Sequence, residues 1–288
     1  MERVTQEQAI LGEGPIWDEQ ANVLWWIDIV GKKLFKLDPS SGENSAFDLP
    51  EKPGTVVIAA DGRLVLALKS GFHWFDPQTQ ELTFISDPDR DEPETRFNEG
   101  KCDPAGRFWA GTMEDAETGK HIGSLFSLQN DQCTKHLTGI GVSNGIVWNN
   151  AADTMYYIDS PTRNVDAFDY DQASGTITNR RTVFKVTPEQ GYPDGMSIDS
   201  DDNLWICLWH GWSLIQADPR NGQLLRTIKV PVRNVTACAF GGENLQDLYI
   251  TTARKGNTDV ELEQQPDAGG LFHTTVDAVG TTFAKFAG

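Results

Sequence analysis

The chain has 288 residues, of which 39% are hydrophobic and 23% charged, and its formal net charge is -18 at pH 7. No basic cluster is available to neutralise nucleic-acid phosphates, and no run of 18 apolar residues predicts a membrane-spanning helix, so neither partner is expected. The first residues lack a secretory signal, and the four cysteines are widely spaced with no C-x-x-C pair. Both features favour a cytoplasmic protein with reduced thiols.

Six short apolar stretches recur at a nearly constant spacing. They begin at Glu13, Thr55, Asn98, Asn144, Asp194 and Thr236, which lie 42, 43, 46, 50 and 42 residues apart. A fixed period of this size is typical of an array of repeated supersecondary units. If the array closes into a ring, equivalent positions face one another across its axis, and the polar residues at these starts meet at one point.

Each start is followed by a turn rich in Asp, Asn and Gly and then by two further β-type runs. The second runs are Val23–Asp28, Leu64–Leu68, Phe108–Thr112, Met155–Asp159, Leu204–Leu208 and Leu248–Thr252. The third runs are Lys33–Leu37, His73–Phe75, Ser124–Leu128, Val165–Phe168, Ser213–Ala217 and Gly270–His273. With a shorter fourth run, this pattern predicts an all-β, six-bladed β-propeller with four antiparallel strands per blade.

We expect residues 1–288 to form a single propeller domain. The N-terminal segment near Val4 is expected to complete the sixth blade, because closing a ring requires a strand from each end of the chain. The long segments Asp87–Thr95 and Lys255–Ala268 are expected to be loops on one face of the ring.

The polar starts have two interpretations. Asn144-Gly145 and Asp194-Gly195 are turn dipeptides in most sequences. Their shared position at the start of the innermost strand argues against a plain turn. The carboxylates of Glu13 and Asp194 and the amides of Asn98 and Asn144 are also the oxygen donors that hard divalent cations bind. The sequence therefore indicates a candidate metal site.

Other residues are candidates for the pocket around that site. Arg96 lies two residues before Asn98 and shares its face of an extended strand, or it is a surface arginine among the acids just upstream. Trp209 and Trp212 lie in a loop and are candidate pocket walls. No H-E-x-x-H, G-x-S-x-G or Walker sequence is present, which disfavours zincin, serine-hydrolase and nucleotidase chemistry.

Several ordered motifs together resemble the senescence-marker-protein/gluconolactonase (regucalcin-like) family along essentially the whole chain. They are Gly12–Trp17, Arg96–Lys101, Asp103–Arg107, Gly111–Met113, Ser143–Gly145, Tyr157–Ser160, Pro193–Met196 and Cys238–Gly242. The resemblance implies that Glu13, Asn144 and Asp194 are metal ligands and that Asp194 is the acid/base residue. It also implies that Arg96 and Asn98 bind the substrate.

The chain departs from the family at one substrate contact. Animal members have a glutamate three residues after the methionine of the Gly-Thr-Met motif, and this chain has Ala116 there. Either one of the flanking acids Glu114, Asp115 and Glu117 takes its place, of which we select Glu114, or the contact is absent. The stretch Leu208–Trp212, together with Thr252–Gly256, is more similar to bacterial pentono- and hexonolactonases.

The expected function is metal-dependent hydrolysis of the ester bond of a sugar aldonolactone by a monomer or weak homo-oligomer. Oxygen ligands are compatible with calcium, zinc, manganese, magnesium or iron(II), and the residues do not select one of them. A phosphotriesterase-like hydrolase and a non-catalytic calcium-binding propeller are the alternatives. Neither the preferred lactone nor the residue that replaces the missing glutamate follows from the sequence.

Overall fold

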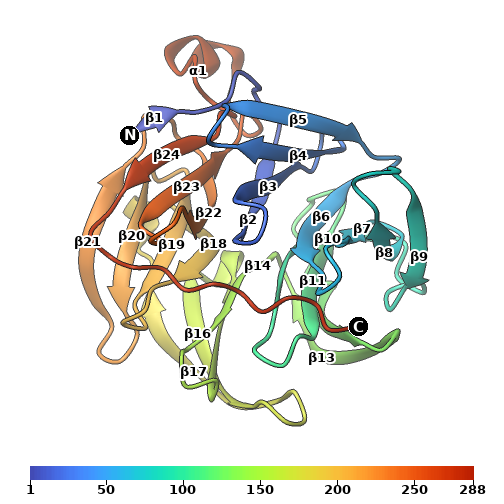
Figure 1. Cartoon of the computed structure of the whole chain (residues 1–288). Helices are drawn as coiled ribbons and strands as arrows, with labels where there is room; N and C mark the ends of the chain where they lie inside the picture. Colours follow the sequence, from blue (N-terminus) through green and yellow to red (C-terminus); the bar gives the residue numbers. More distant parts are fainter.

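Six four-stranded antiparallel sheets are arranged as a ring in the computed structural model, which describes residues 1–288 (Figure 1). Blade one has β2 (Gly12–Asp18), β3 (Val23–Asp28), β4 (Lys33–Asp38) and β5 (Glu43–Asp48); blade two has β6 (Pro53–Ile58), β7 (Leu64–Leu68), β8 (Gly71–Phe75) and β9 (Leu82–Ser86). Blade three has β10 (Thr95–Cys102), β11 (Phe108–Glu114), β12 (Gly123–Gln129) and β13 (Gln132–Ile140); blade four has β14 (Ser143–Trp148), β15 (Thr154–Asp159), β16 (Asn164–Asp171) and β17 (Thr176–Lys185). Blade five has β18 (Tyr192–Ile198), β19 (Leu204–Trp209), β20 (Ser213–Asp218) and β21 (Gln223–Lys229); blade six has β22 (Val235–Gly241), β23 (Asp247–Thr252), β24 (Phe272–Thr275) and β1 (Glu2–Arg3). The predicted six-bladed β-propeller is confirmed.

The strand boundaries follow the predicted runs closely. Among the second and third strands the largest difference is three residues, at the end of β16. The second strands β3 and β7 are buried along their whole length, whereas the outermost strand β5 alternates between exposed and half-buried positions. Each sheet packs between two neighbouring sheets, so apolar side chains are required on both of its faces.

The N-terminus closes the ring. Strand β1 pairs with β24 in antiparallel register, with Glu2 opposite His273 and Arg3 opposite Phe272. The backbone N–H of Val4 then donates to the carbonyl of Leu271 at 2.9 Å. The expectation that the N-terminal segment completes the sixth blade is therefore confirmed.

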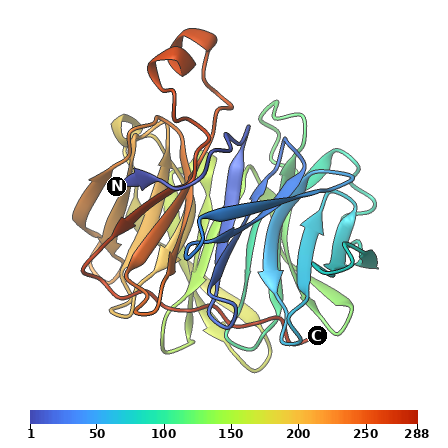
Figure 2. The same cartoon turned by 45° about the horizontal axis from the view of Figure 1, so that its top comes forward.

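The segment Lys255–Ala268 is not a plain loop as expected. It contains the helix α1 (Asp259–Gln264), which projects from the end of the ring in Figure 2. Thr258 and Glu261 form a capping box, in which each side chain accepts a hydrogen bond from the other residue's backbone N–H. The sequence T-x-x-E was the available signal for this helix start. Residues 87–94 contain no helix or strand, as expected.

The other helical segments are the 3-10 turns η1 (Ser160–Thr162) and η2 (Pro188–Gln190). No helix of the structure combines the length and the apolar character that crossing a membrane requires.

Every innermost strand has a shift in pairing register near its start. The shifts lie between Glu13 and Ile16, Pro53 and Thr55, Phe97 and Glu99, Ser143 and Ile146, Pro193 and Met196, and Val235 and Cys238. A bulge of this kind bends the strand and changes the direction of a side chain. The dipeptides Asn144-Gly145 and Asp194-Gly195 therefore lie within β14 and β18, and their interpretation as plain turns is wrong.

The glycines at two of these bulges lie where inner strands of adjacent blades approach most closely. A Cβ atom on Gly145 would be 2.5 Å from the Cβ of Met196 in the next blade. A Cβ on Gly195 would be 2.5 Å from the Cβ of Ala237 and 2.9 Å from the carbonyl oxygen of Thr236. Close packing near the ring axis therefore requires glycine at both positions.

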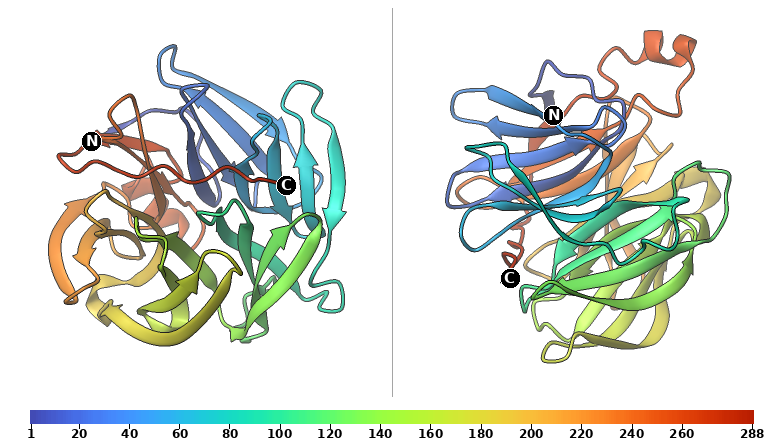
Figure 3. Two further views of the ribbon diagram at one scale, coloured as in Figure 1. Left: turned by 60° about the horizontal axis from the view of Figure 1, so that its bottom comes forward. Right: turned by 90° about the vertical axis from the view of Figure 1, so that its right-hand side faces the viewer.

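Residues 276–288, which we call the C-terminal strap, cross the opposite end of the ring, as the left view of Figure 3 shows. Gly280 pairs with Asp199 of blade five and Phe286 pairs with Ala59 of blade two. Between them, the ring of Phe283 lies 5.3 Å from the Nζ atom of Lys101. The strap therefore covers this end of the axis and leaves the end near α1 for a pocket.

The packing explanation for Gly195 predicts the effect of a single methyl group. Gly195→Ala is expected to lower the free energy of unfolding by about 3 kcal/mol, because the new methyl has no space between adjacent inner strands. Gly42→Ala is the control, since Gly42 has a φ of 74° but no atom near its Cβ; we expect a loss of about 1 kcal/mol from backbone strain. Denaturant unfolding measures both, and equal losses would contradict the close-packing account.

Candidate functional site

A cavity of about 380 Å³ opens at the end of the ring where the inner strands begin. Its fourteen lining residues are Leu11, Glu13, Arg96, Asn98, Met113, Glu117, Val142, Asn144, Ser160, Pro161, Tyr192, Asp194, Trp209 and Lys255. Five of the six residues that the sequence analysis selected for the site are among them. The exception is Glu114.

Glu13, Asn144 and Asp194 lie at the bulges of β2, β14 and β18, and their side chains are buried. Asn144 donates from Nδ2 to the hydroxyl of Ser160 at 2.9 Å, and that hydroxyl donates to the carbonyl of Pro193 at 2.6 Å. This chain of hydrogen bonds uses the amide nitrogen of Asn144 and leaves its oxygen free. The Oδ1 atom of Asn144 and the Oε2 atom of Glu13 are both buried without a hydrogen-bond partner.

The electrostatic environment of these carboxylates is unusual. Burial raises the pKa of Glu13 well above its ordinary value, and the nearby Asp194 and Glu99 raise it further. Burial and Glu99 likewise raise the pKa of Asp194, although the Asn144 side chain opposes them. Buried acids placed this close together cannot all be ionised unless positive charge balances them. One such charge is that of Lys101, which lies 3.1 Å from Glu99 and acts to lower the pKa of Glu13.

The donor set fits a hard divalent cation. Two carboxylates and one carboxamide supply oxygen ligands of the type that calcium, magnesium and manganese prefer. The structure has no cluster of three or more His, Cys, Asp or Glu side chains suited to a metal ion, and the set of Glu13, Asn144 and Asp194 has only two such residues. Its unpartnered buried oxygens, which are costly to bury alone, are the observation that favours a cation.

Arg96 and Asn98 form a connected pair beside this set. The Nη1 atom of Arg96 donates to the Oδ1 atom of Asn98 at 2.7 Å and to the carbonyl of Phe97 at 3.0 Å. Asn98 donates from Nδ2 to the carbonyl of Ser143 at 2.9 Å. Only 3% of Arg96 is exposed, so its interpretation as a surface arginine among acids is wrong.

Glu114 is directed into its own loop and does not line the cavity. Its carboxylate accepts hydrogen bonds from the N–H of Thr118 at 2.7 Å, the hydroxyl of Thr118 at 2.6 Å and the N–H of Lys120 at 3.1 Å. The hydrogen bond from the Thr118 hydroxyl is the main cause that lowers the pKa of Glu114. The structure therefore separates Glu114 from the other selected residues.

Glu117 is the acid of this loop that reaches the cavity. Its Oε1 atom lies 3.1 Å from Nη2 of Arg96 and also accepts a hydrogen bond from Nζ of Lys255. Burial acts to raise the pKa of Glu117, but the hydrogen bond and charge of Lys255, with the charge of Arg96, lower it overall. From the sequence, Glu117 was one of three flanking acids but was not the one selected, and Lys255 was not selected at all. The conformation of the loop and the contact across the ring leave no local signal in the sequence.

Aromatic side chains form one wall of the cavity. Trp209 lines it, as predicted, whereas Trp212 does not line it and is 41% exposed. Tyr192, at the start of β18, is an additional aromatic residue that the sequence analysis did not select.

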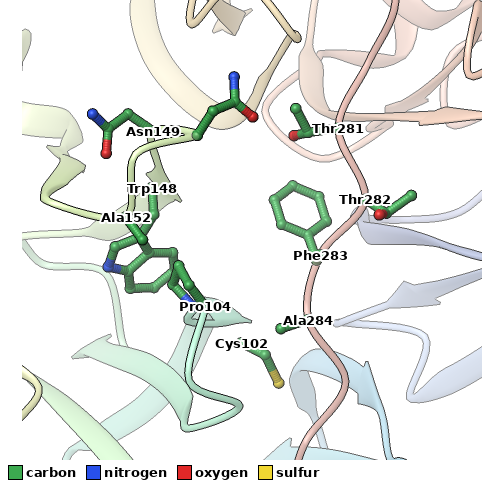
Figure 4. Close-up of a pocket in the computed structure, with 10 residues that line it drawn as sticks. Cys102, Pro104, Trp148, Asn149, Ala152, Thr281, Thr282, Phe283 and Ala284 are labelled. Carbon is green, nitrogen blue, oxygen red and sulfur yellow. The ribbon is translucent and has the colours of Figure 1, made fainter. Parts of the chain in front are cut away.

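A second cavity of about 320 Å³ lies beside the C-terminal strap (Figure 4). Thr281, Thr282, Phe283 and Ala284 of the strap face Trp148 and Pro104 across it. No Asp, Glu, His, Lys or Arg side chain lines this cavity. It therefore lacks the carboxylates and the charged groups that distinguish the cavity at the other end of the ring.

A family model described as the SMP-30/gluconolactonase/LRE-like region matches residues 11–254. The chain belongs to the SMP-30/gluconolactonase family. It is 39% identical to regucalcin of Gallus gallus over 96% of this chain and 94% of that protein. It is 36% identical to the putative sugar lactone lactonase YvrE of Bacillus subtilis (strain 168), over 98% and 96% of the two chains.

The fold is also that of a solved structure. The crystal structure of a calcium-binding protein, regucalcin, from Agrobacterium tumefaciens superposes with a TM-score of 0.94 at 24% identity, covering 99% of this chain and 96% of that one. The family model and the curated relatives confirm the resemblance to the SMP-30/gluconolactonase family inferred from the motifs.

The geometry of Glu114 predicts a role in holding its loop. Glu114→Ala is expected to speed hydrogen exchange at the amides of Thr118 and Lys120, because both lose their acceptor. Exchange measured by mass spectrometry across residues 114–120 tests this, with the strands of blade five as the internal reference. Unchanged exchange in the loop would show that other contacts fix it.

Proposed function

We propose that this protein is a metal-dependent lactonase that hydrolyses the ester bond of sugar aldonolactones to give the aldonic acid. The observation that carries the proposal is the pair of unpartnered buried oxygens on Glu13 and Asn144, beside Asp194, in a cavity that Arg96 also lines. Its volume of about 380 Å³ suits a small ligand. The Bacillus subtilis relative named as a putative sugar lactone lactonase supports the substrate class.

Glu13, Asn144 and Asp194 would hold one divalent cation, which is calcium, zinc, manganese, magnesium or iron(II). The Agrobacterium relative described as calcium-binding supports a cation of this class. When bound, such a cation supplies a Lewis acid that polarises a lactone carbonyl and stabilises negative charge on its oxygen.

Asp194 is the proposed acid/base residue. A carboxylate within reach of the lactone accepts a proton from the attacking water, whose oxygen forms the new bond to the carbonyl carbon. The ester bond to the ring oxygen then breaks, and the same proton passes from Asp194 to that oxygen. The balance is one lactone and one water consumed for one hydroxy acid formed.

Arg96 and Asn98 are proposed to orient the sugar. The amide oxygen of Asn98 accepts a hydrogen bond from Arg96, and its amide nitrogen donates to the carbonyl of Ser143. Asn98 therefore holds the guanidinium group of Arg96 in place. Arg96 in turn presents its charge to the cavity, and the one N–H of its Nη2 atom that is not directed to Glu117 hydrogen-bonds a hydroxyl of the lactone. A lactone fixed in this way meets the water in a reactive orientation without further ordering, which lowers the barrier.

Asp194→Ala tests the central assignment. We expect lactone hydrolysis to fall at least about a thousandfold and cation affinity to fall with it, because one side chain serves both functions. Asp201→Ala is the matched control, since Asp201 is an exposed acid in the turn at the opposite end of blade five. A pH-stat assay over several aldonolactones and calorimetric cation titration provide the two measurements.

Near-normal lactonase rates in Asp194→Ala would contradict the mechanism. The same assay includes a phosphofluoridate, and its hydrolysis by the wild type in place of the lactones would favour a phosphotriesterase. Failure to hydrolyse either class with any added cation would favour a non-catalytic propeller.

Cation removal gives a second test that also has a stability readout. Chelation is expected to abolish hydrolysis, and adding back the preferred cation at a hundred times its Kd is expected to stabilise the fold by about 2.7 kcal/mol through linkage. Thermal unfolding and lactonase rate are followed together for each of the five cations. Full activity in the metal-stripped protein would exclude metal dependence.

A further inference from the structure

An ion pair spans the mouth of the cavity from one side of the ring to the other. Lys255 follows β23 in blade six, and its ammonium contacts the carboxylate of Glu117, which follows β11 in blade three. With two blades between them on either side, blades three and six are opposite one another in the ring. Both residues line the cavity, so the pair lies over the space that a ligand occupies.

The backbone holds both partners in place. The N–H of Lys255 donates to the carbonyl of Ile10 at 2.8 Å, and its carbonyl accepts a hydrogen bond from Asn234 at 2.7 Å. Two residues before Glu117, Asp115 is bound by Lys52 at 2.5 Å and Lys69 at 2.6 Å from blade two. The two side chains therefore meet through fixed anchors on both sides of the cavity.

Stability does not account for this pair. The side chains of Lys255 and Glu117 are 32% and 35% exposed, and ion pairs this accessible to water contribute little to folding. The ring is closed elsewhere, by the pairing of β1 with β24. The placement of the pair over the cavity is its distinguishing feature.

The unused hydrogen-bonding capacity of the pair suits hydroxyl groups. An ammonium has three N–H donors, and Glu117 is the only side chain to which Lys255 donates. Arg96, by contrast, already directs donors to Phe97, Asn98 and Glu117. A hydroxyl that accepts from Lys255, next to one that donates to Glu117, would satisfy both charged groups at once.

The pair is also linked to the candidate ligand set by a continuous series of contacts. Glu117 contacts Arg96 at 3.1 Å, Arg96 contacts Asn98 at 2.7 Å, and Asn98 binds the carbonyl of Ser143 at 2.9 Å, next to Asn144 in the chain. A ligand with one end at Asn144 thus has its other end toward Glu117 and Lys255.

We propose that Lys255 and Glu117 form a specificity subsite that recognises adjacent hydroxyls on the part of the lactone farthest from its carbonyl. The inference rests on the proposed lactonase function. It assigns the recognition of the distal hydroxyls to a lysine and a glutamate from opposite blades.

The experiment compares lactones with and without distal hydroxyls. In Lys255→Met and Glu117→Gln, kcat/KM for a pentonolactone and a hexonolactone is expected to fall about tenfold, mainly through KM, because a charged hydrogen bond is lost. For γ-butyrolactone, which has no hydroxyls, kcat/KM is expected to stay within about twofold. Lys33→Met is the matched control, since Lys33 forms an exposed ion pair with Asp48 in blade one and does not line the cavity.

Thermal unfolding of each variant confirms that it is folded. Equal losses on hydroxylated lactones and on γ-butyrolactone, or no loss on either, would overturn the subsite. If the wild type opens no lactone, the proposed function is wrong. In that case, calorimetric titration of xylose into the wild type and into Lys255→Met tests separately whether the subsite binds hydroxyl groups. Weaker binding to the variant then supports it, and equal or absent binding overturns it.

Discussion

The structure depends on the crowding of six inner strands around one axis. At Gly145 and Gly195 the strands of adjacent blades approach so closely that no Cβ atom fits. Each inner strand also carries a register shift at this level, which bends it and turns a polar side chain toward the axis. Close packing and a polar centre are thus two results of the same geometry, and both account for the recurring polar residue beside glycine.

Five of the six equivalent positions divide into two groups by their hydrogen bonds. Thr55, Asn98 and Thr236 each donate to a carbonyl of the next inner strand, at 3.0, 2.9 and 2.6 Å, and so fasten adjacent blades. Glu13 and Asn144 instead retain buried oxygens without partners. Because buried acceptors without a donor are costly, the ring is complete as a fold but leaves an unbalanced group of oxygens at its mouth. That imbalance is what a cation would correct.

Sequence periodicity predicted the ring well, because each blade repeats the same local pattern of apolar runs and turns. It also placed Glu13, Asn98, Asn144 and Asp194 at one phase of the repeat, and the family resemblance then singled out Glu13, Asn144 and Asp194 as candidate metal ligands. The phase of the repeat could not show that Glu117 lines the cavity and Glu114 does not. That difference depends on the loop conformation, in which a positive φ of 55° at Glu117 changes the direction of the chain. The axial crowding, the C-terminal strap and the contact with Lys255 were not predicted, since each depends on residues far apart in the sequence.

The side chains that line the cavity come from two kinds of segment, the inner strands and the loops. Glu13, Asn98, Asn144 and Asp194 project from inner strands whose positions are set by the closed ring, so their spacing cannot change without disturbing several blades. Glu117 and Lys255 come from segments outside the strands, where substitutions and changes of length are tolerated more easily. A propeller of this kind can therefore keep one hydrolytic centre while its loops change which substituents of the lactone are recognised. The missing family glutamate at Ala116 and the adjacent Glu117 are an example of such a change within one loop.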